Sequence, residues 1–193
     1  MGRFPNSHQP TSDTSSSEPS RRRLHGDDGA TLVEGAIVAP VIILLLFSLL
    51  ELSLLLQTHL AVRYAIDDAT REISLSSDVT SVDDVAMATL QKRTDAMVSA
   101  DIENVVIYQP DAIVDGPSAG CRGGSSSATC QTYGAADVAS GVANCTGSFC
   151  PDTRDDDSLI GIWIKVRHNS ITGIFPDQTI TAKHVQRVSP AAG

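Results

Sequence analysis

The chain has 193 residues, with 41% hydrophobic and 19% charged side chains and a formal net charge of −9. This length allows one modest domain with accessory segments. The acidic balance argues against a nucleic-acid partner, because binding to a phosphate backbone needs a basic surface. The averages hide three regions, since residues 1–29 are polar, residues 30–62 are apolar and the remainder is mixed.

The polar N-terminal region is rich in Ser, Pro and Thr over residues 1–20 and has almost no large apolar side chain there. Such a segment buries too little surface to offset the entropy of ordering, so we expect residues 1–29 to form a disordered leader. Three arginines follow, at Arg21–Arg23. Positive charge beside a membrane span tends to stay in the cytoplasm, which predicts a cytoplasmic N-terminus and an extracytoplasmic C-terminal domain.

An apolar run extends from Gly35 to Leu56 and is interrupted only by Pro40, Ser48, Glu51 and Ser53. A helix of this run is about 33 Å long, which is enough to cross a hydrocarbon core of roughly 30 Å. A secretory signal peptide has a shorter apolar region followed by a small-x-small cleavage site, and residues 57–60 do not form one. The run therefore predicts a retained single-pass membrane anchor.

Helical spacing of apolar side chains continues past the run to about Ile73, which predicts one helix over residues 30–75, the transmembrane helix and an amphipathic extracytoplasmic extension that needs a partner surface. An N-cap pattern at Ser81 predicts a second helix that ends near Ala100. Residue types and alternation predict a short strand at Val105–Tyr108 and two paired strands, at Ile160–Arg167 and Thr179–Val188.

The segment 111–158 is rich in Gly, Ser, Asp and Cys and predicts a long loop within an extracytoplasmic domain of residues 76–193. The expected class is α+β: a long N-terminal transmembrane helix continues into a small exported domain with a second helix and a short antiparallel sheet.

All four cysteines lie in this segment, at Cys121, Cys130, Cys145 and Cys150. In an exported domain the even count predicts two disulfides, and local pairing of the first two and the last two is the simplest of the three connectivities. A zinc site is the alternative, but no His lies beside these cysteines and no C-x-x-C occurs.

No motif in the sequence predicts catalysis. The five histidines are scattered, and H-E-x-x-H, G-x-S-x-G and the phosphate-binding Gly-rich loops do not occur. Asp152 and Asp155–Asp157 could hold calcium by carboxylate count, but they lack the Gly turn and the Glu ligand of an EF-hand, which favours a solvated acidic loop. We therefore expect no enzymatic activity, metal or cofactor.

Two acids lie in or beside the apolar run. Glu51 lies about five residues past the middle of the run, roughly 8 Å from the bilayer centre, where a carboxylate costs about 3 kcal/mol. Such residues usually face protein, so Glu51 predicts a contact with a partner helix; a protonated side chain tolerated near the interface is the alternative. Glu34 lies at the cytoplasmic rim, where a charge costs little.

Gly29 is followed by four residues and then by Glu34, directly before the apolar run, and this pattern resembles the class of type IV prepilins. Residues 29–73 are more specifically similar to the TadE-like family of the tight-adherence (Flp-type) pilus system, through Gly29–Glu34, Ala39-Pro40 and Leu50-Glu51-Leu52. Residues 65–72 depart from the N-A-A-R-E-like continuation of that family.

The resemblance implies a minor pseudopilin or pilus-assembly protein of the cell membrane, which becomes associated with an extracellular pilus after processing. A prepilin peptidase would cut between Gly29 and Ala30, and Glu34 of one subunit would neutralise the new α-amine of a neighbour. The implied partners are this peptidase and the transmembrane helices of other pilins or of the pilus platform. A single-pass membrane-anchored extracytoplasmic binding module is the alternative.

Overall fold

The computed structural model describes residues 27–75, 82–95, 97, 99–113, 115–145, 147–153, 159–173 and 175–187. The chain divides into two compact units, Met1–Ile42 and Ile43–Gly193, each of which is described by itself. The expectations for the leader before Asp27 and for the acidic run Asp155–Asp157 lie outside the described residues.

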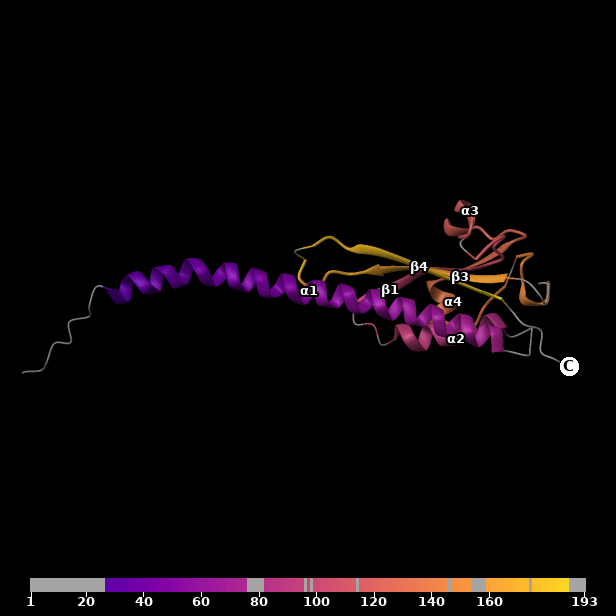
Figure 1. Ribbon diagram of the computed structural model, residues 1–193, viewed down its shortest axis with the longest axis horizontal. Helices are drawn as coiled ribbons and strands as arrows, with labels where there is room; N and C mark the ends of the chain where they lie inside the picture. Colours follow the sequence, from indigo (N-terminus) through magenta and orange to yellow (C-terminus); the bar gives the residue numbers. More distant parts are fainter. Residues whose placement is uncertain are drawn as a thin grey trace, which may run out of the picture. The chain divides into compact units, whose positions relative to one another are not determined.

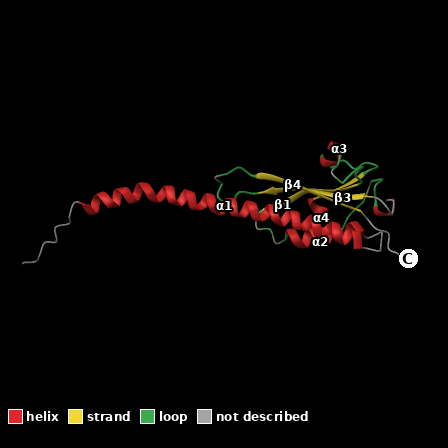
Figure 2. Cartoon of the chain, viewed as in Figure 1, coloured by secondary structure: helices red, strands yellow, loops and turns green. Residues whose placement is uncertain are grey.

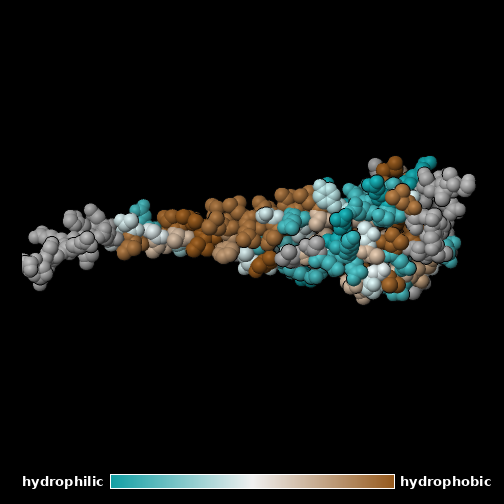
Figure 3. Space-filling view, turned by 90° about the horizontal axis from the view of Figure 1, so that it is seen from below, coloured by the Kyte–Doolittle hydropathy of each residue, from teal (hydrophilic) through white to brown (hydrophobic). Residues whose placement is uncertain are grey.

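The longest element is the helix α1 (Asp27–Leu75), which includes Pro40. From Thr31 onward α1 is long and apolar enough to cross a membrane, and only 6% of its most apolar window is buried. Figure 3 shows the hydrophobic side chains that gather along α1, whereas hydrophilic side chains are frequent over the sheet-containing part. The prediction of one long apolar helix with an extension is confirmed, and the helix ends at Leu75.

The second unit contains a four-stranded antiparallel sheet in the order β2-β1-β3-β4. Its strands are β1 (Ala100–Tyr108), β2 (Cys130–Gly134), β3 (Leu159–His168) and β4 (Gln178–Arg187). The helix α2 (Val82–Thr94) lies beside the second part of α1 on one side of the sheet (Figures 1 and 2). This arrangement confirms the α+β class.

Two predicted boundaries differ from the structure for one reason. The helix α2 ends at Thr94, short of the expected end near Ala100, and β1 begins at Ala100, before the expected start at Val105. Ala100–Ile102 pair with Val166–His168 of β3. This pairing with a buried neighbouring strand overrides the weak local preference for helix.

The prediction of a long loop over residues 111–158 was incomplete. The described part of this segment contains β2 and three short helical turns. These turns are α3 (Ala119–Arg122), α4 (Ala135–Ser140) and the 3₁₀ turn η2 (Pro151–Thr153). The strand β2 pairs with β1 from Asn104↔Gly134 to Tyr108↔Cys130. Its residues, CQTYG, show no apolar alternation that would predict a strand. They form a strand because they pair with the edge of β1.

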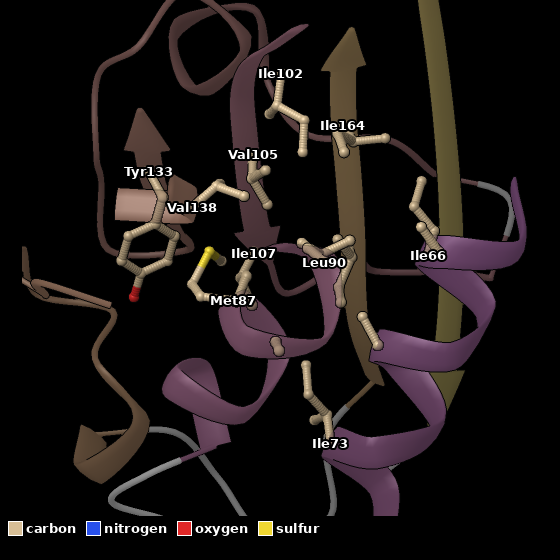
Figure 4. Packing of buried hydrophobic residues seen from close by; sticks show 14 of the residues in the cluster. Ile66, Ile73, Met87, Leu90, Ile102, Val105, Ile107, Tyr133, Val138 and Ile164 are labelled. Carbon is tan, nitrogen blue, oxygen red and sulfur yellow. The ribbon is translucent and has the colours of Figure 1, made fainter. Parts of the chain in front are cut away.

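The main core lies between α1, α2 and one face of the sheet (Figure 4). The buried side chains of α1 recur at helical spacing and are Val62, Ala65, Ile66, Ala69 and Ile73. The side chains that meet them include Met87 and Leu90 from α2, Val105 and Ile107 from β1, and Ile162 and Ile164 from β3. The outer part of α1 is therefore a structural part of the domain.

A smaller cluster covers the opposite face of the sheet and contains Val106, Tyr108 and Trp163 with Cys121 and Cys130. Cys121 and Cys130 form one disulfide, with a Cα–Cα distance of 6.3 Å, and Cys145 and Cys150 form the other, at 5.7 Å. This is the local pairing that the spacing favoured. The first disulfide therefore fixes the segment that closes this face of the sheet.

Gly161 lies directly opposite Tyr108 in the sheet. A Cβ atom at Gly161 would lie 2.5 Å from Cζ of the Tyr108 ring. The ring cannot easily move, because it is buried and its hydroxyl donates to the carbonyl of Asp115 at 2.9 Å. Burial, with the nearby Asp115 carboxylate, also raises the pKa of Tyr108 to about 12.

We therefore expect Gly161→Ala to lower the free energy of unfolding by about 1–3 kcal/mol through overpacking. Urea unfolding of the detergent-solubilised chain, followed by Trp163 fluorescence, measures this change. Gly120→Ala is the matched control, because its added methyl group would meet nothing closer than Ser118 Oγ at 3.9 Å. Equal stability of the two variants would show that the Tyr108 ring does not constrain position 161.

Candidate functional site

The predicted processing site lies in the first turns of α1. Gly29 and Ala30 follow the helix start at Asp27, and Glu34 lies one turn later. The side chain of Glu34 is exposed, and apart from the adjoining residues and the backbone of the helix itself, nothing lies within 4 Å of the position of a Cβ at Gly29. The Gly29–Ala30 peptide bond therefore lies at the end of a helix, where local unwinding of the backbone costs the least free energy.

Glu51 lies in the second unit and faces the loop that joins β3 to β4. Its side chain is only 4% exposed. The backbone N–H of Ile171 donates to Glu51 Oε1 at 3.1 Å. In Figure 1 this loop lies against α1. The carboxylate thus accepts a hydrogen bond from the turn of its own chain.

A second polar contact joins α1 to the end of β3. Thr58 Oγ1 lies 3.2 Å from Nδ1 of the buried His168 and donates to the carbonyl of Leu54 at 3.0 Å. Because the hydroxyl hydrogen is used on Leu54, Nδ1 of His168 is the donor to Thr58. This contact fixes the orientation of the imidazole ring.

The base of the loop is held by charged groups. Arg167 Nη2 lies 2.9 Å from Asp177 Oδ2, and the backbone N–H of Ser170 donates to Asp177 Oδ1 at 3.3 Å. The hydrogen bond from Arg167 lowers the pKa of Asp177 below its ordinary value, and the Ser170 N–H acts in the same direction. Because the pair is exposed, it contributes more to the orientation of the loop than to stability.

An apolar groove of about 400 Å³ lies beside Glu51, between α1 and the loop. Its apolar lining comes mainly from Leu45, Leu49 and Leu52 of α1 and from Phe175 and Pro176 of the loop. No cluster of three or more His, Cys, Asp or Glu that could hold a metal occurs among the residues placed by the structure. The groove is therefore suited to apolar packing.

Comparison with known families adds an independent observation. Residues 29–71 match the family model described as TadE-like protein. The match begins at Gly29 and covers the span and most of the buried extension, but less than a quarter of the chain. A search of curated proteins and a search of solved structures gave no match.

The predicted site residues lie at separate places. Gly29, Ala30 and Glu34 belong to the first unit, Glu51 belongs to the second, and the Cys121–Cys130 disulfide covers the face of the sheet opposite α1. The contact of Glu51 with a partner helix stays a prediction, since its contact here is within the chain. The sequence analysis predicted no element between Arg167 and Thr179 and missed this connection as the partner of Glu51.

The hydrogen bond from Ile171 to Glu51 can be tested by substitution. We expect Glu51→Leu to speed amide hydrogen exchange at Ile171 by about ten-fold or more, because a hydrogen bond to a charged group contributes about 1.5–3 kcal/mol. Glu51→Gln keeps an acceptor oxygen and is the matched control. We expect it to increase the exchange rate at Ile171 by less. Mass spectrometry of the chain in lipid nanodiscs measures the exchange. Unchanged exchange in Glu51→Leu would mean that the carboxylate does not hold the loop.

Proposed function

We propose that the chain is a minor pseudopilin, a pilus-assembly protein of a tight-adherence pilus or related secretion system. The observation that carries this proposal is the TadE-like match, whose first residue is Gly29, the residue after which a prepilin peptidase would cut. The exposed apolar surface of α1 supports the membrane anchor that such a protein needs. The first unit then contains the processing site, and the second contains the rest of the span together with the displayed domain.

Orientation follows from charge and cysteine chemistry. The three arginines at 21–23 favour a cytoplasmic N-terminus. The two disulfides favour an extracytoplasmic domain, because disulfides persist in oxidising compartments. The chain is thus a single-pass protein that reaches the outside with residues 76–193.

Cleavage acts as the switch for assembly in this proposal. The polar leader blocks close packing of α1 against other transmembrane helices, and its removal exposes the α-amine of Ala30. In a low-dielectric setting this amine pairs with the Glu34 carboxylate of a neighbouring subunit. The partners are the prepilin peptidase and the helices of other pilins or of the pilus platform.

N-terminal sequencing tests the processing step. Protein purified from membranes of a host with a prepilin peptidase should begin A-T-L-V-E. Gly29→Val should remain uncut, because the larger side chain blocks the close approach of the protease, while the open space around position 29 leaves the fold intact. Gly35→Val, at an equally open position, is the control and should be cut. An intact Met1 in the unmodified chain, or a cut near Leu60, would refute the proposal.

The role of Glu34 needs a separate test. We expect Glu34→Ala and Glu34→Gln to insert in the membrane and to be processed, but to be lost from assembled pilus or pilus-platform fractions. Removing one partner of a desolvated charge pair costs about 3–5 kcal/mol. Glu34→Asp keeps the charge and should retain part of the assembly. Full assembly of Glu34→Gln, measured by immunoblotting of the fractions, would exclude the charge pair, and the anchored binding module would then be favoured.

A further inference from the structure

The loop between β3 and β4 presents apolar side chains that the domain does not cover. Ile171 is 57% exposed and Phe175 is 45% exposed. No charged residue occurs in residues 169–176. An uncharged turn with two exposed large apolar side chains is unusual next to a polar domain surface and fits an apolar environment.

Two contacts fix the position of this loop along α1. The end of β3 meets α1 where His168 contacts Thr58, and the loop meets α1 where Ile171 donates to Glu51. Seven residues separate Glu51 from Thr58, which is about 10 Å along a helix. The loop therefore extends from the sheet toward the apolar part of α1.

The surface of α1 at this level is hydrophobic before and after Glu51. Leu50 is 49% exposed before it, and Leu52 and Leu56 are 62% and 58% exposed after it. If α1 spans a membrane, these leucines lie at the depth of the acyl chains or of the adjacent interface. Leu52 lines the apolar groove together with Phe175, so an apolar medium that covers Leu52 also reaches the loop.

Both α1 and the β3–β4 loop change from apolar to polar side chains. On α1 the leucines give way to Gln57, Thr58 and His59. On the loop, Phe175 and Pro176 give way to Asp177, which pairs with Arg167. Such a shared boundary is expected where two neighbouring segments leave one bilayer surface.

We propose that the tip of the β3–β4 loop, with Ile171 and Phe175, inserts into the outer part of the hydrocarbon core of the lipid bilayer beside α1. Glu51 is the positioning residue, because its carboxylate holds the loop backbone at the level of the exposed leucines. The turn in exchange donates a backbone hydrogen bond to Oε1 of an acid that would otherwise face lipid. The occupant of the apolar groove lined by Leu49, Leu52 and Phe175 is then a lipid acyl chain.

The inference rests on the membrane span of the proposed function, and fluorescence quenching can test the two separately. The full chain is reconstituted in phosphatidylcholine vesicles, with its single tryptophan removed by Trp163→Phe and a new one introduced at one position. Phe175→Trp reports on the loop and Leu46→Trp on the span. Val142→Trp, at an exposed apolar position outside the loop and α1, reports on the domain surface. Lipids brominated along the acyl chain quench only tryptophans in the bilayer.

We expect blue-shifted emission and a loss of intensity for Phe175→Trp and Leu46→Trp, with no loss for Val142→Trp. Quenching of Leu46→Trp without quenching of Phe175→Trp overturns the inference and leaves the span intact. Absence of quenching in both refutes the span and the inference together. Quenching of Phe175→Trp that disappears as the protein-to-lipid ratio rises also overturns it, because a second copy of the chain then covers the loop.

Crosslinking provides a measurement that does not depend on the Trp163→Phe background. Benzoylphenylalanine at position 171 of the otherwise unmodified chain should form a photoadduct with phosphatidylcholine, seen as an added lipid mass. The same group at position 142 is the control and should form none. Equal adduct formation at the two positions, or adducts with protein alone at position 171, would overturn the inference.

Discussion

The burial of the outer part of α1 is the constraint on which the rest of the domain depends. Val62, Ala65 and Ala69 are fully buried, and with Ile66 and Ile73 they form the stripe against which α2 and the sheet pack. The small alanine side chains allow close approach of the neighbouring elements. Because the same helix carries the apolar run, the anchor and the core of the domain are one element. Loss of α1 would therefore remove part of the core as well as the attachment to a membrane.

The surroundings of α1 change along its length in a way that its sequence encodes. Before Leu56 the apolar side chains are exposed nearly all round the helix, which suits lipid or other apolar helices. After Thr58 the apolar side chains are confined to one stripe, and charged residues such as Arg63 and Asp67 lie between them. Glu51 and Thr58 lie at the change, and each binds a polar group at one end of the β3–β4 connection. Hydrogen bonds at this boundary thus fix the position of the sheet along the helix.

The sequence was sufficient to predict the elements that follow a strong period. The apolar run with its helical extension predicted α1, and the alternation of Ile160, Ile162 and Ile164 predicted β3. Short spacing in the chain also favoured the observed cysteine pairs. The strand β2 was missed, because its residues form a strand only through pairing with β1. The partner of Glu51 was missed for a related reason: Ile171 donates from its backbone N–H, which every non-proline residue carries, so no side-chain pattern marks it.

The central claim is that one continuous helix joins the apolar run to the buried stripe of the domain. Amide hydrogen exchange along α1, measured by mass spectrometry on the full chain in lipid nanodiscs, tests it most directly. We predict slow exchange without interruption from Gly35 to Ile73, since lipid protects the first part and tertiary packing protects the second. A fast-exchanging break between Leu56 and Val62 would contradict the account, because it would separate a membrane anchor from an independently folded domain.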